Sequence, residues 1–259
     1  MKLRAILLMG TTTAAILFFA FGKDPEAQTT TKGGQPAVSE PQIEINPASK
    51  ARIKFDHEEW DFGAIPKDTK VVHNFRITNT GEDTLIIAKV RPTCGCTAAP
   101  LSSDKIPPKG EAFIYAGFNT KNINGRVTKW IYVNSTDPIN PYLRISFSAT
   151  INDPAQLITT TPFEVDFGQV IVGEVKSMKA ILTNTDLSQM ELVLIDEPSK
   201  PSITANISRS KIGPNDKSEL TIILAPQNQL GEFSKSISLE AKNRPETRIT
   251  IPIKGNVIG

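Results

Sequence analysis

The chain contains a long internal repeat. Asp61-Phe62-Gly63 recurs as Asp166-Phe167-Gly168, and Asn79-Thr80-Gly81 recurs as Asn184-Thr185-Asp186, both at an offset of 105 residues. Further along, Gly125 and Gly231 correspond at an offset of 106, so one residue is inserted between the pairs. A period this long exceeds a solenoid unit and fits two tandem all-β domains of about 100 residues each. The chain is therefore expected to fold as two related modules.

Alternating apolar and polar residues predict β-strands in both copies. In the first copy Val71, His73, Phe75 and Ile77 occupy every second position, which is typical of a half-buried strand. Prolines fall mostly between such runs, as strand boundaries require. About seven short strands per copy predict an all-β chain of two tandem immunoglobulin-like β-sandwiches.

The repeat also sets the expected domain boundaries. Module 1 is predicted over residues 51–152 and module 2 over residues 155–259, joined at Asn152-Asp153-Pro154. So short a joint restricts the movement of one module relative to the other.

The N-terminus has the composition of an export signal. Basic residues at Lys2 and Arg4 precede a mostly apolar run that ends near Gly22, with small residues at cleavage-like spacing. We predict a signal peptide over residues 1–22, with an uncleaved membrane anchor as the alternative. Residues 23–50 have the composition of a flexible polar linker. The protein is therefore expected in the periplasm or cell envelope, and it contacts the membrane only in the alternative case of an uncleaved N-terminal anchor.

Module 1 carries an ordered set of motifs that resembles a known family. The motifs are Trp60-Asp61-Phe62-Gly63-Ala64-Ile65, His73-Asn74-Phe75, Asn79-Thr80-Gly81, Cys94-Gly95-Cys96-Thr97 and Pro107-Pro108-Lys109-Gly110-Glu111. Together they resemble an exported bacterial family of unknown function that has a Cys-Gly-Cys-Thr signature and is similar to Hydin-type (ASH) immunoglobulin-like modules. The resemblance covers roughly residues 54 to 135. It implies an exported β-sandwich and no established biochemical activity.

Cys94 and Cys96 are the only cysteines, and module 2 has Lys200-Pro201-Ser202-Ile203 in their place. Two residues apart on a strand, they share a face at a Cα separation of about 6.5 Å, so a disulfide requires the local bending that Gly95 permits. The same arrangement offers two thiolates to copper or zinc, with His73 as a further ligand. A structural disulfide or thiol pair, metal binding and thiol–disulfide exchange all remain open.

The two histidines differ in their expected environments. His73 shares an apolar strand face with Phe75, and Met178 occupies the corresponding position in module 2. A hydrogen-bonded core histidine is therefore one interpretation, and metal ligation beside the cysteines is the other. His57, at the edge of module 1, is expected to be solvated.

The sequence offers no catalytic constellation. Asp61-Phe62-Gly63 matches the kinase magnesium motif in letters only, since no glycine-rich loop or catalytic His-Arg-Asp accompanies it. Both triplets are expected at turns, with Phe62 and Phe167 buried. The net charge of +2, without a basic and aromatic cluster, argues against nucleic acid.

The sequence therefore predicts a non-enzymatic interaction or scaffolding module of the bacterial envelope, which binds a protein partner and needs no cofactor. Periplasmic copper or zinc handling through Cys94 and Cys96 is the alternative function, and thiol redox exchange is the third.

Overall fold

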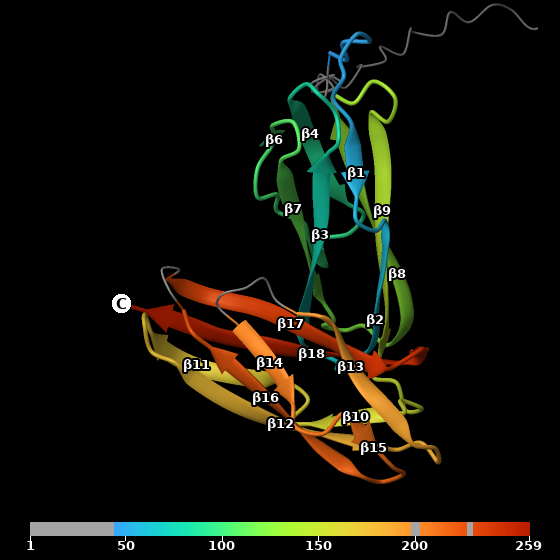
Figure 1. Ribbon diagram of the computed structural model, residues 1–259, viewed down its shortest axis with the longest axis vertical. Coiled ribbons are helices and arrows are strands. Elements are labelled where there is room, and N and C mark those ends of the chain that lie inside the picture. Colours follow the sequence, from blue (N-terminus) through green and yellow to red (C-terminus); the bar gives the residue numbers. More distant parts are fainter. Residues whose placement is uncertain (1–43, 198–202, 227–229) are drawn as a thin grey trace, which may run out of the picture. The chain divides into compact units, whose positions relative to one another are not determined.

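The computed structural model describes residues 44–197, 203–226 and 230–259 (Figure 1). The described residues form eighteen β-strands. No helix within those three ranges is long and apolar enough to cross a membrane. The predicted signal segment, residues 1–22, and most of the predicted linker lie outside the described residues.

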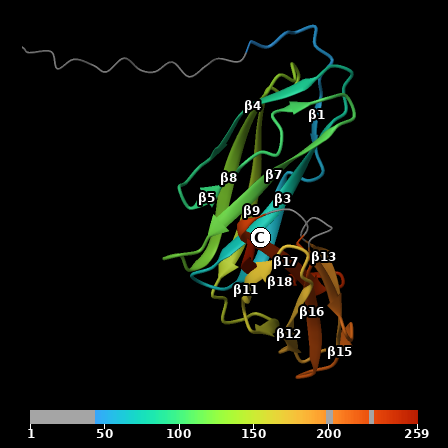
Figure 2. The ribbon, with the colours of Figure 1, turned by 90° about the vertical axis from the view of Figure 1, so that its left-hand side faces the viewer.

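Module 1 is a sandwich of two sheets. Its strands are β1 (Ile53–Phe55), β2 (Glu59–Ile65), β3 (Lys70–Asn79), β4 (Leu85–Pro92), β5 (Thr97–Ala98), β6 (Lys105–Ile106), β7 (Glu111–Asn119), β8 (Gly125–Ser135) and β9 (Tyr142–Ile151). One sheet has the order β1-β3-β7-β5, and the other runs β2-β9-β8-β4-β6. Figure 2 shows β3 and β7 of the first sheet and β8 and β9 of the second. The first sheet is antiparallel, whereas β2 lies parallel to β9 in the second.

Module 2 repeats this plan. Its strands are β10 (Ile158–Thr161), β11 (Val165–Ile171), β12 (Lys176–Asn184), β13 (Met190–Asp196), β14 (Ile203–Ile207), β15 (Lys211–Ile212), β16 (Lys217–Leu224), β17 (Gly231–Ala241) and β18 (Arg244–Ile258). One sheet has the order β10-β12-β16-β14, and the other runs β15-β13-β17-β18, with β11 parallel to β18. The predicted all-β fold of two immunoglobulin-like sandwiches is confirmed.

The repeated asparagine has a structural cause in both modules. Asn79 and Asn184 each end a strand, and both are fully buried. The Asn79 side-chain amide donates to the carbonyl oxygens of Asp83 and Ile106, and that of Asn184 makes the corresponding bonds around its own turn. Because a buried carbonyl without a partner is costly, one asparagine satisfies a whole turn in each copy.

The repeated Asp-Phe-Gly triplets lie inside strands and not at the turns expected from the sequence. Each interrupts a parallel pairing, β2 with β9 and β11 with β18, at a register shift. Gly63 and Gly168 have φ of 68° and 62°, a conformation that glycine adopts without steric penalty. Phe62 and Phe167 are buried, as predicted. The triplet therefore kinks a strand while keeping its aromatic ring in the core.

Ordered structure begins before the predicted end of the linker. Ser49 donates its backbone N–H to the Asn46 carbonyl, and the Lys50 N–H donates to the Asp83 carboxylate at 2.7 Å. The Lys50 ammonium also pairs with Glu82. Residues 46–50 are thus attached to the turn that follows β3.

The two modules have separate cores that meet at one residue. Fully buried phenylalanines, including Phe75 and Phe147, fill module 1, and aliphatic residues such as Leu220 fill module 2. Ala64 belongs to module 1 by sequence but packs in the core of module 2. On β2, Ala64 also pairs with Ile249 of β18, which makes one continuous sheet of ten strands across both modules.

Candidate functional site

A line of closely spaced polar side chains connects the two modules. His73 on β3 is 3% exposed, and its Nδ1 lies 2.6 Å from Asp196 Oδ2 on β13 of module 2. Its Nε2 lies 2.6 Å from Nε2 of His57. His57 Nδ1 is in turn 3.3 Å from Asp56 Oδ1. The line Asp56-His57-His73-Asp196 therefore runs from the edge of module 1 into module 2.

With Asp196 ionised, one arrangement of protons satisfies every contact along this line. The Asp196 carboxylate can only accept, so His73 donates from Nδ1. A neutral His73 then has a bare Nε2, which accepts the Nε2–H of His57. At 2.6 Å only one proton fits between the two Nε2 atoms. Any further proton taken up by His57 must bind at Nδ1, which faces Asp56.

The contact between the modules, called the junction below, is formed by His57, Trp60 and His73 of module 1 and Asp196 and Arg248 of module 2. It also perturbs the titration of His57. Burial lowers the pKa of His57 below its ordinary value, and the neighbouring His73 lowers it further. Asp56 and Asp196 act in the opposite direction with smaller effect. The neutral form of His57 is therefore favoured by the folded junction.

Aromatic and cationic side chains surround the buried histidine. The Trp60 ring stacks on His73 with centroids 4.1 Å apart and planes inclined by 4°. The guanidinium carbon of Arg248, from β18, lies 5.1 Å from the Trp60 centroid, within cation–π range. Arg248 also forms an ion pair of 2.7 Å with Glu240, and both side chains are largely buried.

Three further hydrogen bonds bind the backbone of module 1 to side chains of module 2. Arg248 donates to the Asp61 carbonyl at 2.9 Å, and Thr250 donates to the Phe62 carbonyl at 2.7 Å. The Val72 N–H donates to the Ser236 hydroxyl at 2.8 Å. Gly63 permits this approach, because a Cβ there would lie 2.1 Å from the Arg248 carbonyl oxygen. Gly63 is therefore required both by its positive φ and by the close approach of Arg248.

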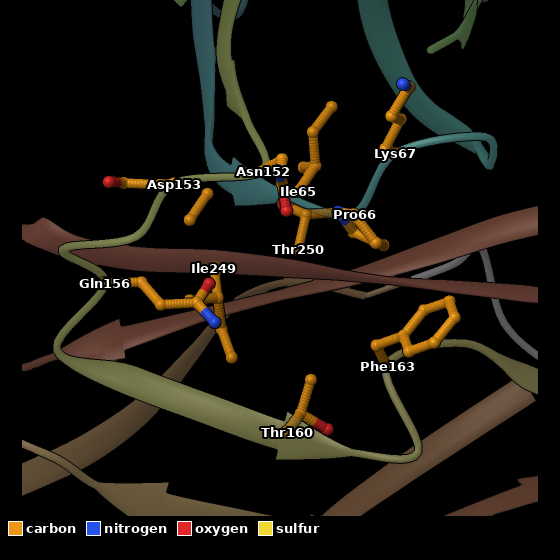
Figure 3. A pocket seen from close by; sticks show the side chains of 11 residues that line it. Ile65, Pro66, Lys67, Asn152, Asp153, Gln156, Thr160, Phe163, Ile249 and Thr250 are labelled. Carbon is orange, nitrogen blue, oxygen red and sulfur yellow. The ribbon is translucent and has the colours of Figure 1, made fainter. Parts of the chain in front are cut away.

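A cleft of about 310 Å³ lies beside this pairing (Figure 3). Its walls come from Pro66 and Lys67 of module 1, from Asp153 at the joint and from Phe163 of module 2. In Figure 3 the charged ends of Lys67 and Asp153 point away from each other. These two charged groups therefore do not point toward a common ligand position in the cleft.

Cys94 and Cys96 are joined by a disulfide, with Cα atoms 5.3 Å apart. They lie in the bend between β4 and β5, which shortens the Cα separation below that of a straight strand. Thr97 Oγ1 lies 3.4 Å from Cys94 Sγ. Both sulfur-bearing residues are half-buried, and Gly95 between them is exposed. The pair is thus oxidised and within reach of solvent.

The structure does not bring His73 to the cysteines. His73 is hydrogen-bonded to His57 and Asp196 instead, and this matches the interpretation as a hydrogen-bonded core histidine. In the described part of the chain, no three His, Cys, Asp or Glu side chains are placed to hold a metal ion. His57 is not solvated as expected but half-buried against His73 and Phe75.

Sequence reasoning missed Asp196 and Arg248, although the repeat contained a signal for them. At the 105-residue offset, Asp196 corresponds to Arg91, and at 106 Arg248 corresponds to Tyr142. His73 likewise corresponds to Met178. At all three positions, which lie where the modules meet, the two copies carry different side chains.

Comparison with protein families accounts for both modules. Residues 53–151 match a family of unknown function, DUF1573, and residues 157–256 match the HYDIN/CFA65/VesB-like Ig-like domain. Each match spans one of the two modules and a little under two-fifths of the chain. The resemblance seen in the sequence is thus confirmed at the level of the family. The region that matches DUF1573 contains the disulfide, both histidines and Trp60.

Solved structures show distant likeness to this pair of domains. A protein of unknown function from Porphyromonas gingivalis W83 is 16% identical, with 79% of this chain and 99% of that chain covered and a TM-score of 0.34. The ASH/PapD-like domain 7 of human CEP192 is 12% identical, covering 41% and 89%, with a TM-score of 0.32. The YadV chaperone is 16% identical, covering 78% and 98%, with a TM-score of 0.30. No curated protein matches the sequence. Likeness this distant carries no argument about function.

Proposed function

We propose that this chain is an exported, non-enzymatic protein of the bacterial cell envelope that binds a protein partner with its two sandwiches held together as one unit. The observation that carries the proposal is the junction, in which His73 of one module bonds Asp196 of the other at 2.6 Å. A linker alone would suffice for modules that act separately. Two modules in a fixed arrangement present the surfaces of both modules to a partner. The chain then loses less conformational entropy on binding than two freely moving modules would.

The proposed location rests on the N-terminal sequence and on the cysteines. Residues 1–22 have the composition of an export signal. A disulfide between Cys94 and Cys96 is the oxidation state expected outside the cytoplasm. Both features favour the periplasm or cell envelope.

The location can be tested by producing the chain with its own N-terminus in a bacterium. Fractionation followed by intact mass analysis is expected to place the protein in the periplasmic or membrane fraction. Loss of residues 1–22 would indicate cleavage, and full mass in the membrane fraction would indicate the anchor. Protein found only in the cytoplasm would contradict export.

The interaction function can be tested by crosslinking in the envelope. Wild-type protein is expected to capture a specific partner, and Gly63→Ala, which disturbs the junction, is expected to capture it less. Gly125→Ala, which also places a methyl group at positive φ but meets no atom within 4 Å, is the matched control. Failure to capture any partner with both modules intact would contradict the proposal.

A second candidate function, thiol–disulfide exchange, is favoured by the solvent-accessible Cys94–Cys96 bond. An attacking dithiol would reduce this bond to two thiols and become a disulfide itself, with two electrons and two protons transferred. Copper or zinc binding would require the same reduction first, because thiolates are the ligands. Incubation with a reduced dithiol, followed by thiol counting by mass, tests the exchange. An unchanged disulfide after prolonged incubation would contradict it.

A further inference from the structure

Module 1 contacts module 2 through a site around Gly63. Module 2 has a corresponding site around Gly168, and that site is open to solvent. In module 1 the site is nearly filled by the start of β18, which leaves about 70 Å³. The corresponding surface of module 2 encloses a hollow of about 400 Å³. The corresponding pairs of lining residues are Asp61 and Asp166, Gly63 and Gly168, Ala64 and Gln169, Arg126 and Glu232, and Thr150 and Asn256.

The two kinked glycines show the difference directly. A Cβ on Gly63 would meet the Arg248 backbone, whereas a Cβ on Gly168 would meet no atom within 4 Å. Both have the same left-handed φ. The docking shape is therefore present twice within the described chain, but β18 fills only one of the two sites.

Exposed apolar side chains lie at the same end of module 2. Ile171, Val175 and Leu230 are each more than half exposed. Ile171 pairs with Ile258 at the end of β18, and Leu230 lies 3.8 Å from the Cβ position of Gly259. None of the three lines the hollow itself, but Ile171 follows the lining residue Gln169 by two positions on β11. Exposed apolar residues on one surface are typical of a protein-binding site.

Module 1 carries the counterpart of the element that would fill this hollow. At the 106-residue offset, Arg248 and Ile249 of β18 correspond to Tyr142 and Leu143 of β9. Tyr142 and the nearby Ile139 are 67% and 65% exposed. β2 pairs with β9 only from Ser146 onward, so the first residues of β9 keep this edge available.

We propose that the hollow of module 2 receives the β8–β9 hairpin of a second copy of this chain. In the docked pair, Gln169 of one copy lies beside Leu143 of the other, as Ala64 lies beside Ile249 within the chain. The exposed Tyr142 and Ile139 of the second copy cover Ile171 and Leu230. This docking deepens the proposed function, on which it rests, by naming one protein partner.

The charges in the hollow are compatible with this occupant. Lys254 bonds Glu164 at 2.6 Å and lies 3.7 Å from Asp166. In the β8–β9 loop, Asp137 is fully buried and accepts hydrogen bonds from the N–H groups of Ile53 and Ile139. The loop therefore presents the exposed Ile139 to a site in which Lys254 is already paired with Glu164 and Asp166, while Glu232 also lines the hollow.

The interface joins two different surfaces, so it is heterologous, and this gives a sharp test. Sedimentation of the full chain is expected to show an average mass that rises with concentration up to about 1 mM, as a weak interface predicts. Ile171→Asp and Tyr142→Asp should each abolish this rise, because each charges one half of the interface. Their equimolar mixture should form dimers and nothing larger, since one intact interface is restored.

Several results would overturn the docking. They are wild type that stays monomeric, a charge variant that associates like wild type, and a mixture in which no dimer forms. Association that survives in both variants would mean that another segment, such as the N-terminal one, makes the contact. If Ile171→Asp fails to fold, Val175→Asp tests the same surface.

The register is tested by crosslinking two variants with a short thiol-specific reagent. Gln169→Cys mixed with Tyr142→Cys is expected to give crosslinked dimers. Ile223→Cys, at another partly exposed strand position, should give none with Tyr142→Cys. Equal yields in the two mixtures would contradict the docking. Capture of an envelope partner by protein that stays monomeric would leave the proposed function standing and overturn this inference alone.

Discussion

His73 of β3 donates a hydrogen bond of 2.6 Å to Asp196 of β13, a residue 123 positions away in the other module. His73 is almost fully buried, and Asp196 is one-fifth exposed. The Trp60 ring stacks on the His73 ring, and the partly exposed His57 contacts His73 at the other ring nitrogen. The two sandwiches therefore share a buried polar contact as well as one continuous sheet.

Acid is expected to weaken the folded chain through His57. In the unfolded chain His57 titrates near 6.5, and in the junction burial and His73 lower its pKa. The unfolded state binds the proton more readily than the folded state. The part of the free energy of unfolding that depends on neutral His57 is therefore fully present above about pH 6.5 and is lost as the pH falls through the folded pKa. Unfolding in urea from pH 8 to pH 5 measures the slope. The slope should be smaller in His57→Asn, and an identical slope in that variant would count against His57.

The two repeated glycines give a matched pair of substitutions. Gly63→Ala and Gly168→Ala each place a side chain at positive φ, at a cost of about 1 kcal/mol. Only the change at Gly63 also forces a Cβ against the Arg248 carbonyl. We expect the free energy of unfolding to fall by at least about 2 kcal/mol more for Gly63→Ala. Equal losses, measured by chemical denaturation at low protein concentration, would show that the contact with Arg248 is absent.

The disulfide is expected to contribute little to global stability. Cys94 and Cys96 are two positions apart, so the bond closes a very small loop and removes little entropy from the unfolded chain. Reduction, or the double change of both cysteines to serine, should lower the free energy of unfolding by less than about 2 kcal/mol. A loss above about 4 kcal/mol would assign the pair a major structural role.

The fold follows from the sequence because its signals are local. Period-two alternation predicts strands such as β3, and the recurrence of Asn79 as Asn184 predicts two copies of one sandwich. The error at Asp61-Phe62-Gly63 is also local, since a glycine with positive φ serves equally in a turn and in a kinked strand. The same Asp-Phe-Gly sequence is compatible with a turn and with a kinked strand.

The junction could not be predicted in the same way. Its bond between His73 and Asp196 depends on how two complete modules pack, and periodicity within one strand carries no information about it. The useful signal was a difference between the copies. Met178 replaces His73, and Arg91 stands where module 2 has Asp196. Those differences become informative only when positions are compared in pairs across the repeat.

The most direct test of the central claim is a double-mutant cycle on His73 and Asp196. His73→Met introduces the residue that module 2 has at this position, and Asp196→Ala removes the carboxylate. We expect each change to lower the free energy of unfolding by about 1–3 kcal/mol and the pair to couple by at least about 1 kcal/mol. The exposed pair Arg76 and Glu111, 3.5 Å apart within module 1, should couple by less than about 0.5 kcal/mol. A coupling between His73 and Asp196 no larger than this control would contradict a junction that holds the two modules together.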